Sequence, residues 1–75
     1  MNKKARDMFE ELGYKIDCDD VNWLIYNFED VFKILFYKPH QEIQIIYEKK
    51  IYNSIDMEEL QAINQQCKEL GWVDE

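Results

Sequence analysis

Hydrophobic residues recur at a helical period at both ends of the chain and alternate with polar residues in between. In the stretch 54–72 the apolar positions are three or four residues apart, which predicts one amphipathic helix. Asp56 and Glu59 have the spacing of a capping box, and Gly71 can adopt the left-handed conformation that ends a helix. The predicted apolar stripe consists of Met57, Leu60, Ile63, Cys67 and Leu70.

The first residues repeat this pattern over a shorter length. We predict a helix that Asn2 caps and that runs to about Leu12, with Gly13 as its stop. Its apolar face consists of Ala5, Met8, Phe9 and Leu12. The lysines at 3–4 and the glutamates at 10–11 oppose the helix dipole, so this helix should be the weaker of the two.

Between the helices the pattern has a period of two, which is typical of strands. Aromatic and branched residues dominate the segments, and acidic pairs or a proline separate them. The predicted strands are Tyr14–Cys18, Trp23–Phe28, Val31–Tyr37 and Glu42–Glu48. Pro39 cannot donate a ladder hydrogen bond and therefore belongs in the turn between the last two strands.

The last two strands allow the register to be predicted. If Tyr37 lies opposite Glu42, one face of the hairpin is wholly apolar and can serve as the floor for both helices. Its pairs are Phe36/Ile43, Ile34/Ile45 and Phe32/Tyr47, whereas the other face carries Leu35/Gln44, Lys33/Ile46 and Val31/Glu48. We therefore predict an α+β fold in which residues 1–75 form a single two-layer domain, with both helices on one face of three or four antiparallel strands.

The face on which Trp23 lies depends on the connection near residues 29–30. A two-residue connection directs Trp23 and Ile25 towards the helices, and a connection one residue longer reverses that assignment. In both cases large apolar side chains occupy the face without helices, which favours an interface over a solvated surface. The two-residue case predicts an interface of Leu24, Tyr26, Phe28, Val31, Leu35, Tyr37 and Ile46.

The net charge of −7 argues against negatively charged partners. Phosphate groups would repel such a chain, so direct binding to nucleic acid or to an anionic membrane is not expected. A set of carboxylates could instead meet a basic groove in a partner, although solubility alone also explains them. This acidic set is Asp17, Asp19, Asp20, Glu29, Asp30, Glu58 and Glu59.

Catalytic chemistry is not expected from these residue types. The chain has one serine and one histidine, and no threonine. Ser54 is placed to start a helix, and His40 lies in a turn, so neither forms an evident nucleophile–base pair with Cys18 or Cys67. We predict no enzymatic activity and no catalytic residue.

Metal and cofactor sites are also not expected. Asp17, Asp19 and Asp20 resemble the start of a calcium loop, but the sixth position is Asn22 and the twelfth is Phe28, where a glycine and a glutamate are required. Two cysteines and one histidine, scattered along the chain, do not make a zinc site. The two glycines are helix stops and form no phosphate-binding loop, so we predict no cofactor.

The chain lacks an apolar run long enough to span a bilayer and begins without the apolar core of a signal peptide. Cys18 and Cys67 are therefore most simply reduced thiols, with a disulfide between them as the alternative. Both observations favour a cytoplasmic protein.

The segments M-N-K-K-A-R-D-M-F-E-E-L-G-Y and I-D-M-E-E-L-Q-A-I-N-Q-Q-C-K-E-L-G-W resemble the ends of small uncharacterised accessory proteins. Phages and integrated elements of Gram-positive bacteria carry such proteins. The resemblance implies a phage protein acting in a bacterial cytoplasm, where small acidic phage proteins often bind and block a host factor. It implies no catalytic or ligand residue.

The favoured hypothesis is a non-enzymatic protein-binding module that inhibits a host or defence protein, with a homodimer as a further possibility. One alternative is an oligomer that sequesters a nucleotide-like ligand on aromatics such as Trp23, Tyr26 and Tyr37. Another is a structural or assembly protein of a virion.

Overall fold

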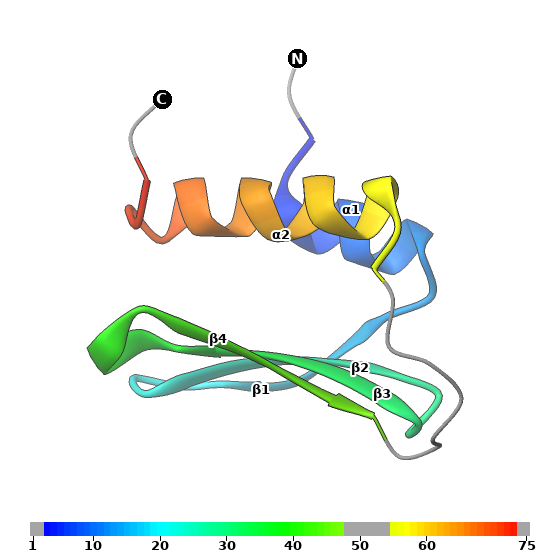
Figure 1. Cartoon of the computed structure of the whole chain (residues 1–75), viewed down its shortest axis with the longest axis horizontal. Helices are drawn as coiled ribbons and strands as arrows, with labels where there is room; N and C mark the ends of the chain where they lie inside the picture. The colour runs from blue at the N-terminus through cyan, green and yellow to red at the C-terminus, as the bar shows by residue number, and fades with distance from the viewer. Residues whose placement is uncertain (1–2, 48–54, 74–75) are drawn as a thin grey trace.

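The computed structural model, which describes residues 3–47 and 55–73, confirms the α+β fold. The elements are α1 (Ala5–Glu11), β1 (Lys15–Asp19), β2 (Trp23–Phe28), β3 (Phe32–Tyr37), the short 3₁₀ turn η1 (Lys38–His40), β4 (Glu42–Tyr47) and α2 (Met57–Glu69). The strands form one antiparallel sheet in the order β1-β2-β3-β4. Both helices lie on the same side of this sheet (Figure 1).

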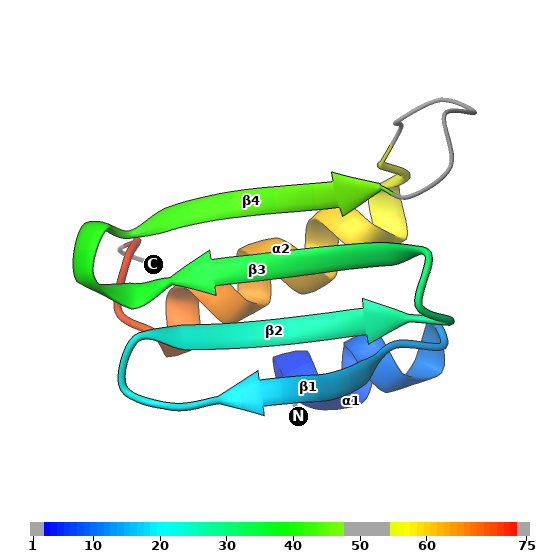
Figure 2. The same cartoon turned by 90° about the horizontal axis from the view of Figure 1, so that it is seen from below.

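The helices share the covered face unequally. Figure 2 shows α1 behind β1, and α2 crossing obliquely from the C-terminal end of β4, where the helix begins, towards β2.

Both helices stop where the sequence predicts. The backbone N–H groups of Tyr14 and Trp72 donate to the carbonyl groups of Phe9 and Cys67, each at 2.9 Å, in the Schellman arrangement.

The predicted register of β3 and β4 is correct. Tyr37 lies opposite Glu42, and the pairs Phe36/Ile43, Ile34/Ile45, Phe32/Tyr47, Leu35/Gln44 and Lys33/Ile46 follow from it. The predicted partner of Val31, Glu48, lies outside the described residues. The helix-facing side of this hairpin is therefore the apolar side.

The turn between β2 and β3 decides the orientation of β2. Glu29 and Asp30 both have positive φ angles, 51° and 59°, and the Val31 N–H donates to the Phe28 carbonyl at 3.0 Å. Because Phe28 pairs with Phe32, the connection between β2 and β3 consists of three residues, 29–31, and Val31 is the additional one. Alternate residues of β2, including Leu24, therefore point towards the helices.

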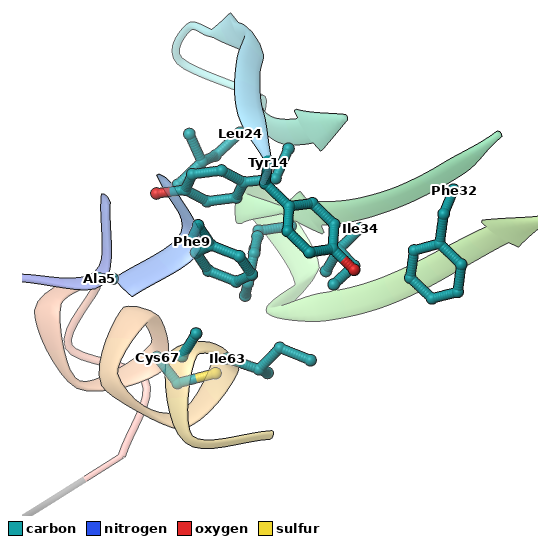
Figure 3. Close-up of a cluster of buried hydrophobic side chains, with 11 residues drawn as sticks. Ala5, Phe9, Tyr14, Leu24, Phe32, Ile34, Ile63 and Cys67 are labelled. Carbon is teal, nitrogen blue, oxygen red and sulfur yellow. The ribbon is translucent and has the colours of Figure 1, made fainter. Parts of the chain in front are cut away.

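The core fills the space between the two layers (Figure 3). Phe9 of α1 stacks on Tyr26 of β2 with a ring separation of 3.9 Å, and both residues are almost completely buried. The Tyr26 hydroxyl donates to Oε1 of Gln66 on α2 at 2.7 Å, which gives both of these oxygen atoms a hydrogen-bond partner inside the core. Tyr26 of β2 thus contacts both helices, through Phe9 of α1 and Gln66 of α2.

Two predictions about the helices need correction. The Met57 and Leu60 side chains are 65% and 50% exposed, although they were predicted to be core residues. The buried face of α2 is instead rotated towards α1 and includes Ala62 and Gln66, because the two helices pack against each other as well as on the sheet. The predicted cap Asn2 lies outside the described residues, and the N-cap of α1 is Lys4, which makes no side-chain capping bond.

Candidate protein interface

The face of the sheet opposite the helices is uncovered among the described residues (Figure 1). We call it the open face. On β2, β3 and β4, side-chain alternation and the strand register assign to it Trp23, Ile25, Asn27, Lys33, Leu35, Tyr37, Glu42, Gln44 and Ile46. Between β2 and β3, Trp23 lies opposite Tyr37, and Ile25 lies opposite Leu35.

An apolar patch on the open face runs from Ile25 and Leu35, near its centre, to Trp23 and Tyr37 at the end of the sheet. The Trp23 and Tyr37 rings are 4.6 Å apart, and Tyr37 stacks on His40 with a ring separation of 5.6 Å. Leu35 is only 8% exposed, although it does not belong to the core cluster beneath the helices. Neighbouring side chains of the open face therefore shield it, and the patch behaves as a small second cluster.

The predicted interface is partly wrong. Leu24 and Tyr26 are 5% and 2% exposed and belong to the core, because the longer connection turns them towards the helices. Phe28 and Val31 are half-buried against that core. Trp23 and Ile25 take the places of the misassigned β2 residues.

The remaining predicted interface residues, Leu35, Tyr37 and Ile46, lie on the open face. Ile46 is 43% exposed at its border. The structure also separates the three aromatics of the ligand hypothesis, because Tyr26 lies on the opposite side of the sheet from Trp23 and Tyr37.

Strand β4 forms one edge of the sheet and is the most exposed strand. Ile43 and Ile45 point to the helix side but are 40% and 39% exposed. The sequence pattern correctly assigned them to the apolar face but did not reveal this exposure. A usable signal was the run Ile45-Ile46, which gives an outer strand apolar residues on both faces.

The structure divides the predicted acidic set among three places. These places are β1 and its following turn (Asp17, Asp19, Asp20), the β2–β3 turn (Glu29, Asp30) and the first turn of α2 (Glu58, Glu59). The set is therefore not one row of carboxylates.

Basic side chains accompany the β1 group. Lys33 lies 3.6 Å from Asp17, and Lys38 lies 3.3 Å from Asp19. Arg6 of α1 is 3.9 Å from Asp19. Such exposed pairs add little stability, but they locally offset the negative charge along this edge.

The acids at the start of α2 hold the helix in place. The capping box is complete, since Asp56 accepts from the Glu59 N–H at 2.8 Å and Glu59 accepts from the Asp56 N–H at 3.1 Å. Glu59 also accepts a hydrogen bond from the Tyr14 hydroxyl. Burial, followed by this contact with the carboxylate, raises the pKa of Tyr14.

Neither thiol is activated. Partial desolvation and a hydrogen bond to Asp20 raise the pKa of Cys18, and burial raises the pKa of Cys67. Both cysteines are free. Burial likewise raises the pKa of Tyr26 to about 12, so this hydroxyl stays protonated as a structural donor.

A hollow of about 350 Å³ opens between the ends of the helices and the β2–β3 end of the sheet. Its polar lining includes Asp56 and Glu59, which already bond to backbone groups and to Tyr14. The described residues contain no group of three or more potential metal ligands.

No family model, curated protein or solved structure matches this chain. Neither of the described helices combines the length and apolarity needed to cross a membrane.

Proposed function

We propose that the protein is a non-enzymatic protein-binding module that receives a partner protein on its open face. The observation that carries this proposal is the apolar patch formed by Trp23, Ile25, Leu35 and Tyr37, which neither helix covers. Tryptophan and tyrosine are the residues that most often dominate binding energy at the centres of interfaces. Polar residues at the border of the open face, such as Lys33 and Glu42, suit the rim of such an interface.

The charge of the chain specifies the partner further. A net charge of −7 accelerates association with a surface that is basic around an apolar centre. The resemblance of the terminal segments extends this proposal to a phage accessory protein that inhibits a host or defence protein in the bacterial cytoplasm. Neither cysteine is prepared as a nucleophile, because the pKa values of both thiols are raised.

Affinity purification with cross-linking from bacterial lysate tests the proposal. The informative variant is Ile25→Lys, which places a charge at the centre of the open face. Its control is Val21→Lys, the same change at a residue that is 82% exposed in the β1–β2 turn. A basic partner should be retained by the wild type and by the control but lost by Ile25→Lys, with both variants folded by circular dichroism. Equal retention by the two variants, or no partner at all, contradicts the proposal.

A further inference from the structure

The outer edge of β4 carries unpaired backbone groups among the described residues. In an antiparallel ladder, successive residues direct their N–H and C=O groups to opposite sides. The Lys38 N–H donates towards β2, to the Asn22 carbonyl at 2.8 Å, so its neighbour Tyr37 faces β4. The partner of Tyr37, Glu42, therefore faces β3, and the alternation leaves Ile43, Ile45 and Tyr47 with backbone groups on the outer edge.

The side chains along this edge do not prevent pairing. The segment Ile43–Tyr47 contains no charged residue and no proline, in a chain with a net charge of −7. Its register with β3 is regular, without a bulge. Edge strands in monomeric proteins are normally protected by charges, prolines or bulges. None of these devices is present between residues 43 and 47.

Helix α2 adds an apolar side chain to the same side of the molecule. Leu60 is 50% exposed. It lies about 180° around the helix from Glu69, since nine residues at 100° each separate them. Glu69 accepts a hydrogen bond from the Ala5 N–H of α1 at 2.7 Å, so Leu60 lies on the flank away from α1. This flank borders β4 (Figure 2).

We propose that a second copy of this chain pairs with β4 in antiparallel orientation, about a two-fold axis at Ile45. Two four-stranded sheets then join into one sheet of eight strands, with all helices on the same face. In this register Ile45 lies opposite Ile45 of the second copy, and Ile43 lies opposite Tyr47. These are the residues whose backbone groups point outward, so each pair can exchange two hydrogen bonds.

The distribution of exposed apolar side chains favours a second copy over an unrelated strand. A two-fold axis places the exposed isoleucines of the helix side opposite one another, which covers apolar surface on both copies. No like charges meet between residues 43 and 47, but this register sets the glutamates at positions 42 and 48 of the sequence opposite each other, and their repulsion weakens the pairing. The open face remains free in this dimer, so the inference does not depend on the proposed function.

Sedimentation velocity across a concentration series tests the dimer. We expect the wild type and Val21→Lys to dimerise with equal affinity. Ile45→Lys should raise the dissociation constant at least about tenfold, because two like charges would face each other at the axis. A wild type that remains monomeric up to about 1 mM, where even a millimolar dimer is substantially populated, would overturn the proposal. Equal dimerisation of Ile45→Lys and Val21→Lys would also overturn it.

Cross-linking tests the register independently of the effect of charge. In a Cys18→Ser background, Ile45→Cys places two thiols on residues whose Cα atoms are about 5.5 Å apart, within the range of a disulfide. Gln44→Cys is the control, because residue 44 lies opposite Ile46 in this register. With oxidised glutathione, the dimer should form through position 45 and not through position 44. Cross-linking through position 44 alone would contradict the proposed axis, and a partner strand from another protein would leave both variants uncross-linked.

Discussion

The two edges of the sheet differ in almost every feature that controls strand pairing. Strand β1 alternates charged with less polar residues, and its register shifts between Ile16 and Cys18, which leaves Asp17 as a bulge. Three ion pairs connect β1 to neighbouring basic residues. Strand β4 has a regular register and presents Ile43, Ile45 and Ile46 to solvent.

This difference indicates that the β1 edge resists the addition of another strand and that the β4 edge does not. We call them the closed edge and the open edge. A bulge twists an edge strand, and charged side chains would be desolvated by an added strand, so both features discourage pairing at β1. The helices follow the same division. Helix α1 lies behind β1, whereas α2 leaves the isoleucines of β4 partly exposed (Figure 2).

The sharpest test of the open edge uses proline at two adjacent positions. Gln44→Pro removes an N–H that bonds to β3 and should cost roughly 2–4 kcal/mol of unfolding free energy. Ile45→Pro removes an N–H that points outward and should cost about 1 kcal/mol. Urea denaturation at a concentration that keeps the protein monomeric measures both values. Equal losses would mean that the outward groups of β4 are misassigned, and the edge comparison would fail.

The glycines that end the two helices differ in the space around them, which gives a second comparison between the α1 side and the α2 side of the molecule. Gly13, at the end of α1, has a φ of +98°, and an added Cβ would lie 2.8 Å from Cε1 of Phe28. Gly71, at the end of α2, has a φ of +78°, but nothing lies within 4 Å of such a Cβ. We expect Gly71→Ala to cost about 1–2 kcal/mol from the left-handed backbone alone.

Gly13→Ala should cost roughly 2–4 kcal/mol, because displacement of the Phe28 ring adds to the backbone cost. Thermal and urea unfolding of the two variants measure the difference. A larger loss for Gly71→Ala would show that the packing at the α1 side is not the tighter of the two.

The sequence was sufficient to predict where both helices stop, the capping box that starts α2, and the register of β3 and β4. These features depend on residues close in the chain: a capping box, two glycine stops and a hairpin whose apolar faces must match. The orientation of β2 could not be predicted. Its turn places Glu29 and Asp30 at positive φ angles that glycine or asparagine usually signals, so the length of the connection was hidden.

The candidate interface was only partly predictable for the same reason. A single extra residue in the turn exchanged Trp23 and Ile25 for Leu24 and Tyr26 on the open face. The exposure of β4 depends on the oblique path of α2, which is set by its packing on α1 and not by its own apolar stripe. Such packing between segments distant in sequence leaves no local pattern.

The smallest expected effect on stability concerns Asp20, in the turn that directly follows β1. Its carboxylate accepts hydrogen bonds from the Trp23 and Asn22 N–H groups, at 2.7 Å and 2.9 Å. These bonds, the Trp23 bond foremost, hold the pKa of Asp20 below its ordinary value of 3.8. The carboxylate thus stabilises the folded state fully above that ordinary value, and its contribution is lost as the pH falls through the lowered pKa in the folded protein.

Asp20→Asn keeps an acceptor but removes this titration. We expect the variant to be slightly less stable than the wild type at neutral pH, with the difference shrinking as the pH falls from about 5 to about 2. Urea unfolding across this range measures it. Glu42→Gln, at the start of β4, is the matched control, because this carboxylate makes no hydrogen bond or ion pair among the described residues. If the unfolding free energies of both variants follow that of the wild type at every pH, the Asp20 carboxylate does not stabilise the turn after β1, and acid affects the two edges equally.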